Sequence, residues 1–294
     1  MNVPIRSFTQ RVSVRGLFVV AAASLFWTLS VGADEPDVKT QERIATVGRQ
    51  AKEFVERCNF TSTESAPASF RLIPEPILRW SNPTAGAVYG DIHLYTHRGR
   101  PATIVSFYRW FTPDWGSTIE VCSLHPTPIM GVSNGVRFWT PKASPLQWGT
   151  LSDVDAPAAS AAARLPQLRR IASDFTAQLI DTRANAAGVR RPLRRLTQPV
   201  FRYPPPVTDS NYLDGAMFAF VEGTDPELLL FVEAVSAAKS AVWQYGIARL
   251  NRDQLEVLHG DKVVWEADYI SDPNERILEP YSTFSAEMPL KPVR

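Results

Sequence analysis

The chain has 294 residues, with 31 Lys and Arg against 30 Asp and Glu and 45% hydrophobic residues. This length allows one large domain or two domains of ordinary size, each with an apolar core. A near-neutral chain gives no reason to expect nucleic-acid binding, which needs a concentrated basic face.

The N-terminal segment Met1–Ala33 predicts a secretory signal peptide. Three arginines precede an apolar run of about 15 residues, and the small residues Val31-Gly32-Ala33 precede Asp34. This order is typical of a cleavable export signal, and the run is shorter than the roughly 20 residues of a membrane span. We expect an exported mature chain, periplasmic or extracellular, with no membrane span after cleavage. Removing the three arginines of the leader leaves 28 basic residues against 30 acidic ones.

Segments of the mature chain recur in the same order at a nearly constant offset, which drifts only from 123 to 127 residues. The matched pairs include Arg79-Trp80 with Arg202-Tyr203, Gly99 with Gly223, Phe138-Trp139 with Val264-Trp265, and Arg43-Ile44-Ala45 with Arg170-Ile171-Ala172. Self-similarity at a fixed period indicates an internal repeat. We therefore predict a first unit over residues 34–140, a linker over 141–160 and a second unit over 161–294.

Each unit begins with an amphipathic pattern, over residues 41–59 and 165–182, that predicts a helix. Segments rich in β-branched and aromatic residues follow, with turn residues between them. Arg98-Gly99-Arg100-Pro101 and Gly223-Thr224-Asp225-Pro226 are the predicted hairpin turns between the second and third strands. The predicted fold class is α+β, a tandem duplication of a unit of one N-terminal helix packed on an antiparallel sheet of about five strands.

Period-2 alternation assigns the strand residues to two sheet faces. The face expected to meet the helix carries Ile92, Leu94, Val105 and Phe107 in the first unit and Ala216, Phe218, Leu230 and Val232 in the second. The opposite face carries His93, Tyr95, Ile104, Ser106 and Tyr108, and in the second unit Met217, Ala219, Leu229, Phe231 and Glu233. A solvated face would be polar. We therefore expect the opposite faces to cover each other or a partner.

The polar aromatic cluster His93, Tyr95 and Tyr108 is the candidate pocket of the first unit. The second unit has Met217, Ala219 and Glu233 at the matching positions, so the cluster is not repeated. His93 could act there as an acid–base group or a hydrogen-bond donor. The alternative is that these rings pack between the sheets with their polar ends at the rim. We assign no catalytic residue and no cofactor. We assign no metal ligand set either, because the spacing of His93 and His97 on a strand places them about 13 Å apart.

Two further residue pairs have structural interpretations. Cys58 and Cys122 could form a disulfide in an oxidising compartment, or remain two separately buried thiols. Arg79 and Arg202 occupy the same position of the repeat, which points to a charge pair at the end of the sheet.

The segments Arg79-Trp-Ser-Asn-Pro83, Gly99-Arg-Pro101, Asp214-Gly-Ala-Met-Phe-Ala-Phe220 and Gly223-Thr-Asp-Pro-Glu227 resemble those of a family of exported bacterial proteins. No activity is established for that family. The resemblance covers most of the mature chain, and it implies export and the same unit boundaries. It transfers no catalytic residue.

The sequence therefore favours an exported, non-catalytic protein that binds a ligand or an envelope partner. The alternative is an exported enzyme, a hydrolase or isomerase, with a cone-shaped pocket around His93. A third possibility is a scaffolding role in the cell envelope.

Overall fold

The computed structural model describes residues 37–63, 69–142, 146–183, 188–207, 212–237 and 240–287. Residues from Val38 to Arg294 belong to one compact unit. The predicted signal peptide, Met1–Ala33, lies outside the described residues. Within the described ranges, no helix has both the length and the apolar character needed to cross a membrane.

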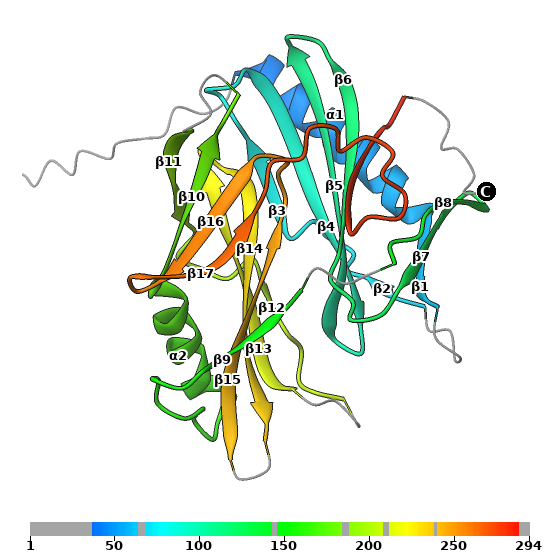
Figure 1. Cartoon of the computed structure of the whole chain (residues 1–294). Coiled ribbons are helices and arrows are strands. Elements are labelled where there is room, and N and C mark those ends of the chain that lie inside the picture. The colour runs from blue at the N-terminus through cyan, green and yellow to red at the C-terminus, as the bar shows by residue number, and fades with distance from the viewer. Residues whose placement is uncertain are drawn as a thin grey trace, which may run out of the picture. The chain divides into compact units, whose positions relative to one another are not determined.

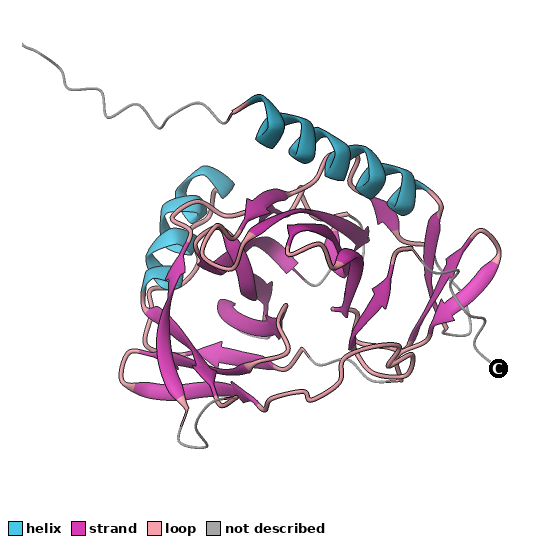
Figure 2. Ribbon diagram, turned by 90° about the horizontal axis from the view of Figure 1, so that it is seen from above, coloured by secondary structure: helices cyan, strands magenta, loops and turns pink. Residues whose placement is uncertain are grey.

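The predicted α+β fold class is wrong. Strands make up 53% of the described residues and helices 14%, in two helices, and the sheets are large and curled (Figure 2). One reason is the segment after the second helix, where Phe175, Ala177 and Leu179 are buried while the residues between them are more exposed. A short apolar run can satisfy helical and strand periods alike. The helix ends at Ser173, and the residues that we expected to complete its apolar stripe form a strand.

The first half consists of a helix and eight strands (Figure 1). They are α1 (Val38–Glu56), β1 (Cys58–Ser62), β2 (Arg71–Leu72), β3 (Leu78–Ser81), β4 (Ala87–His97), β5 (Arg100–Thr112), β6 (Gly116–Ser123), β7 (Ile129–Ser133) and β8 (Val136–Trp139).

The second half repeats this order, with β9 (Trp148–Leu151) before it and β18 (Tyr281–Ser285) after it. Its elements are α2 (Ala161–Ser173), β10 (Phe175–Asp181), β11 (Val189–Arg195), β12 (Phe201–Arg202), β13 (Tyr212–Glu222), β14 (Asp225–Ser236), β15 (Ala241–Arg249), β16 (Gln254–His259) and β17 (Lys262–Ala267). The expected turns between β4 and β5 and between β13 and β14 are confirmed.

Strand pairing also follows the same pattern in both halves. The first half has the orders β1-β7-β8 and β6-β5-β4-β2, and the second has β10-β16-β17 and β15-β14-β13-β11. Short strands β3 and β12 pair with β4 and β13, respectively. In the second half β10 also pairs with β11, which joins the two groups into one nine-stranded sheet.

The two halves exchange edge strands. β9 lies in the segment 141–160 that we interpreted as a linker, and it pairs with β15 of the second half. β18 follows the second half and pairs with β6 of the first half. A hydrogen bond also joins the halves, because the Thr224 hydroxyl, in the turn between β13 and β14, donates to the carbonyl of Ser81 in β3 at 2.8 Å. Each half is thus completed by residues of the other.

Three apolar clusters form the core. One lies between α1 and the sheet of the first half and includes Val47, Phe54 and Val105. A second lies under α2 and includes Leu168 and Phe218. The third draws on both halves, and its members include Ile92, Leu94, Ile104, Met217, Ala219, Leu229 and Phe231. The expected covering of one sheet face by the other half is therefore confirmed.

The assignment of faces is right for the second half and wrong for the β4 strand. A register irregularity between Tyr95 and Thr96 pairs His93 with Val105, so both lie on the face that meets α1. Ile92 and Leu94 consequently belong to the cluster between the halves, not to the helix side. A slip of one residue moves every following side chain to the other face of a sheet.

Candidate functional site

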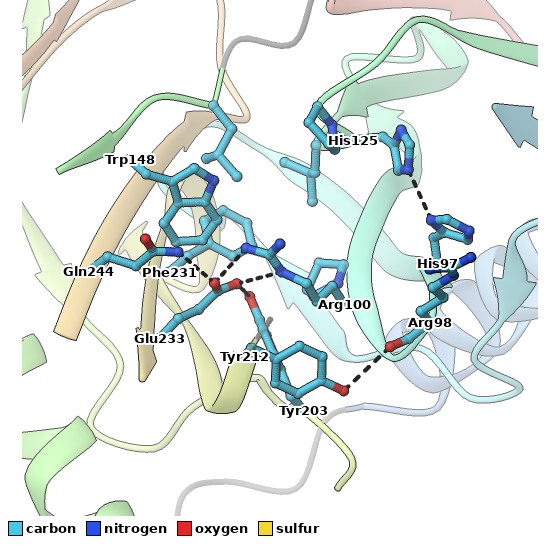
Figure 3. Close-up of a pocket in the computed structure, with 14 residues that line it drawn as sticks. His97, Arg98, Arg100, His125, Trp148, Tyr203, Tyr212, Phe231, Glu233 and Gln244 are labelled. Carbon is cyan, nitrogen blue, oxygen red and sulfur yellow. Dashed lines mark hydrogen bonds and ion pairs between the residues drawn. The ribbon is translucent and has the colours of Figure 1, made fainter. Parts of the chain in front are cut away.

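Two cavities of about 500 Å³ each lie where described residues of both halves meet. The first, which we call the Glu233 pocket, has a volume of about 480 Å³ (Figure 3). Its walls are formed by His97, Arg98, Arg100, Pro101, Leu124, His125, Pro126, Leu146, Trp148, Tyr203, Tyr212, Phe231, Glu233 and Gln244.

Glu233 forms the buried polar centre of this pocket. Its side chain is 0% exposed, and its two carboxylate oxygens accept four hydrogen bonds. Oε1 accepts from the Tyr203 hydroxyl at 2.8 Å and from Arg100 Nε at 3.2 Å. Oε2 accepts from Arg100 Nη2 at 2.5 Å and from Gln244 Nε2 at 3.0 Å. The bidentate arginine fork compensates for the removal of the carboxylate from water.

The local chain explains how these groups converge. Glu233 in β14 lies directly opposite Gln244 in β15 and Gly215 in β13. The ring of Tyr203 packs over Gly215, where a Cβ atom would lie 2.6 Å from the ring. Burial and then the Glu233 charge raise the pKa of Tyr203 well above its usual range, so the phenol keeps its proton and donates.

An aromatic wall encloses the arginine. The guanidinium of Arg100, from the first half, lies 5.2 Å from the ring centre of Trp148 in β9. Phe231 meets that ring edge-on, with the two ring centres 6.4 Å apart. Cation–π contact and the carboxylate together fix the guanidinium plane.

Arg98 stands at the tip of the β4–β5 hairpin, at the rim of the pocket. It is exposed and has a φ of 51°, and Gly99 beside it has a φ of 85°. Positive φ at both central residues is the requirement of the tight turn that suits twisted strands. The hydroxyl of Tyr212 lies 3.4 Å from the Arg98 carbonyl oxygen, which ties the tip to the second half.

Two histidines border the pocket on the side of the first half. His125 Nε2 and His97 Nδ1 lie 3.0 Å apart (Figure 3). The amide of Thr127 donates to His125 Nδ1 at 3.4 Å, and the Thr127 hydroxyl lies 3.0 Å from the same nitrogen. The ring of Phe70 packs against both imidazoles.

The second cavity, the Glu120 pocket, has a volume of about 510 Å³. Its lining combines aromatic rings, amides, carboxyl groups and arginines. The lining residues are Trp80, Asn82, Ala85, Tyr108, Trp110, Trp115, Thr118, Glu120, Leu179, Arg183, Arg191, Glu222, Asp225, Glu227, Leu250, Asn251, Arg252, Asp253, Pro273, Asn274, Tyr281 and Thr283.

Three carboxyl groups of the Glu120 pocket receive hydrogen bonds from neutral donors. Tyr281 donates to Glu120 at 2.5 Å, Asn82 donates to Asp225 at 3.3 Å, and Asn251 donates to Glu227. Burial raises the pKa of Glu120 to about 8. Burial, and then a neighbouring carboxyl group, raise the pKa values of Asp225 and Glu227 well above their usual range.

The two pockets occupy equivalent places in the two halves but differ in chemistry. The row Gly215, Glu233 and Gln244 corresponds to Gly90, Tyr108 and Thr118, which are paired across β4, β5 and β6 in the same way. Trp80 packs over Gly90 as Tyr203 packs over Gly215. The position of Arg100 in the first half is taken by Asp225 in the second. At matching strand positions, the Glu233 pocket therefore carries an arginine where the Glu120 pocket carries a carboxyl group.

No family model, curated protein or solved structure matches this chain. The inference of function therefore rests on these two pockets.

The structure separates the residues of the predicted His93 pocket. His93 and Tyr95 lie in the β4 face under α1, where the Tyr95 hydroxyl donates to the Val55 carbonyl at 2.6 Å. His93 is 2% exposed, neither of its ring nitrogens has a hydrogen-bond partner, and it lines neither of the two pockets. Tyr108 lies on the other face and lines the Glu120 pocket. The three side chains therefore do not share a cavity wall.

Cys58 and Cys122 are both buried free thiols in the structure. Cys58 belongs to the cluster under α1 and Cys122 to the cluster between the halves. Burial raises the pKa of each thiol to about 12, which suppresses the reactive thiolate.

The expected charge pairs of Arg79 and Arg202 are present. Arg79 Nε lies 3.5 Å from Asp91, and Arg202 Nη2 lies 2.7 Å from Asp214. Within the described ranges, no group of three or more His, Cys, Asp and Glu side chains could hold a metal ion.

One motif and the charge pair of the Glu233 pocket were not predicted from the sequence. Gly131-Val132-Ser133-Asn134-Gly135 has the spacing of a nucleophile elbow, but it forms the β7–β8 hairpin, whereas an elbow joins a strand to a helix. The partnership of Arg100 and Glu233 was also missed, because 133 residues separate them. Glu233 standing alone among apolar strand residues was the available signal.

Proposed function

We propose that this protein is an exported, non-catalytic binding protein that holds a small anionic ligand in the Glu233 pocket. The observation that carries the proposal is a second arginine, Arg98, at the rim of a cavity of about 480 Å³ whose one carboxylate is already paired with Arg100. Ligand pockets of roughly 300–1,000 Å³ typically combine apolar walls with a few fixed polar groups. The rings of Trp148, Tyr203 and Phe231 provide such walls.

The charges of the lining favour an anion. The described lining includes two arginines, Arg98 and Arg100, and one carboxylate, that of Glu233, which is already bonded to Arg100. Among these lining residues, the pocket therefore carries a surplus positive charge at Arg98. A carboxylate or phosphate group of a ligand would pair with the Arg98 guanidinium.

The saturation of Glu233 favours binding over catalysis. Each of its oxygens accepts two hydrogen bonds. A general base needs an oxygen within reach of the proton that it removes, whereas both oxygens of Glu233 are committed to holding other side chains. The role that fits Glu233 is to position Arg100, Tyr203 and Gln244.

The protein is also exported and built by duplication of one unit in this proposal. The basic, apolar and small-residue order of Met1–Ala33 supports export. The repeated element order, the repeated pairing and the matched Arg–Asp pairs support an internal duplication. The difference between the two pockets then represents divergence of duplicated sites.

A titration with simple probes tests the ligand class. We expect benzoate and inorganic phosphate to raise the melting temperature of the protein and to bind in calorimetry, and neutral benzamide to do neither. Arg98→Ala should weaken anion binding by about tenfold, the value of one charge-assisted contact. The exposed Arg49 of α1 gives the matched control, Arg49→Ala, which should bind as the unmodified protein does. Equal binding of benzamide, or no effect of Arg98→Ala, would contradict the proposal.

A further inference from the structure

Two neighbouring tryptophans, the exposed Trp115 and the half-buried Trp110, line the Glu120 pocket. Trp115 is 69% exposed on the turn between β5 and β6, and its ring centre lies 4.7 Å from that of Trp110. Both rings line the cavity. A large aromatic side chain left in water, with no place in the core clusters, is the kind of surface feature that marks an interaction site.

The aromatic lining continues inward from this pair. Trp80 and Tyr108 have ring centres 5.5 Å apart, and Tyr281 lies beyond them beside Glu120. Rings from β3, β5, the β5–β6 turn and β18 thus line one cavity. The lining also includes amide side chains, which can both donate and accept hydrogen bonds, those of Asn82, Asn251 and Asn274.

We propose that the Glu120 pocket binds a carbohydrate, with Trp110 and Trp115 stacked on a sugar ring at the mouth and the amides and carboxyl groups bonded to its hydroxyls. A pyranose ring has an apolar face of C–H bonds and a polar rim of hydroxyls. An aromatic platform beside planar hydrogen-bonding groups matches both features.

The charged lining fits a neutral ligand better than an ion. Arg183 lies 3.7 Å from Asp253, and Arg191 lies 2.8 Å from Glu222, so these side chains pair with each other. Arg252 donates to the Tyr269 hydroxyl at 2.7 Å. A cationic ligand would meet three arginines, and an anionic ligand would meet five carboxyl groups.

The protonation of the buried carboxyl groups is consistent with this ligand. Glu120, Asp225 and Glu227 form no ion pair with any Lys or Arg of the described ranges. With a pKa of about 8, Glu120 retains its proton in most molecules at pH 7. A protonated carboxyl group donates one hydrogen bond and accepts others, as recognition of hydroxyl groups requires.

Calorimetric and fluorescence titrations with chitotetraose, cellotetraose and maltotetraose test the proposal. We expect at least one of them to bind and to change the tryptophan emission. Trp115→Ala should weaken that binding by about tenfold or more, and Trp115→Phe should retain most of it. Val263→Ala, at a residue 48% exposed on β17, is the control and should bind as the unmodified protein does.

The outcomes separate this site from the Glu233 pocket. Arg98→Ala should leave oligosaccharide binding unchanged, even if the anion proposal fails. The carbohydrate proposal is overturned if none of the three oligosaccharides binds at about 10 mM, or if Trp115→Ala binds them as tightly as the unmodified protein. Binding of tetramethylammonium in place of the sugars would overturn it in favour of an organic-cation site.

Discussion

At the scale of single residues, Glu233 shows how a buried charge organises a pocket. It is fully buried, yet every one of its hydrogen bonds goes to a side chain of the pocket wall. Removing one partner of such a cluster leaves an uncompensated group, which costs several kcal/mol. The counterpart of Glu233 in the first half is Tyr108, which needs no ionic partner, and there the neighbouring carboxyl groups are held by neutral donors.

His93 gives a prediction at the same scale. Burial, and then the charge of Arg79, lower the pKa of His93 to about 4. The unfolded chain binds this proton near pH 6.5 and the folded chain near pH 4. The contribution of the neutral His93 ring to the free energy of unfolding is therefore complete above pH 6.5 and is lost as the pH falls toward 4. Between these pH values the free energy of unfolding falls by at most about 1.4 kcal/mol per pH unit.

Urea unfolding of His93→Leu between pH 4 and 7 measures this effect. The variant should lose less stability on acidification than the unmodified protein. At pH 7 it should be no less stable, since two buried nitrogens without partners are removed. His259→Leu, at a half-exposed ring stacked on Phe175, is the control and should keep the acid dependence. An unchanged pH profile in His93→Leu would show that this ring does not titrate as described.

At the scale of elements, the edge strand β18 joins the C-terminal region to the first half. It pairs with β6, and its Phe284 enters the cluster under α1, with its ring centre 5.5 Å from that of Phe138. Because Phe284 is 5% exposed, Phe284→Ala should lower the free energy of unfolding by about 3–5 kcal/mol.

Denaturant unfolding at pH 7 checks the docking of β18. Leu278→Ala is a matched control, because Leu278 precedes the strand and is 41% exposed, and its effect should stay within about 0.5 kcal/mol. A loss below about 1 kcal/mol in Phe284→Ala would mean that β18 contributes little to the first half.

The sequence was informative about some elements and silent about others. The hairpin turns were predicted correctly, because Gly99 and Gly223 mark positions of positive φ. Strand β10 was taken for helix, because its apolar residues continue the stripe of α2. The face of His93 depended on a register irregularity at Tyr95 that leaves no mark in the alternation. The pairing of β9 with β15 could not be derived, because local patterns do not specify long-range partners.

At the scale of the whole molecule, the element order of one half is repeated in the other. Each half also pairs with an edge strand that follows the last hairpin of the other half: β9 follows β8 and pairs with β15, and β18 follows β17 and pairs with β6. The cluster between the halves contains residues of both. Both pockets take their walls from both halves as well. Binding at either site therefore depends on the halves folding as one unit.

Differential scanning calorimetry of the purified protein tests this claim most directly. One cooperative unit predicts a single unfolding transition whose calorimetric enthalpy equals its van't Hoff enthalpy. Phe284→Ala should move that whole transition to lower temperature, because a cavity in one half destabilises the shared unit. Two resolved transitions, of which Phe284→Ala shifts only one, would contradict the account.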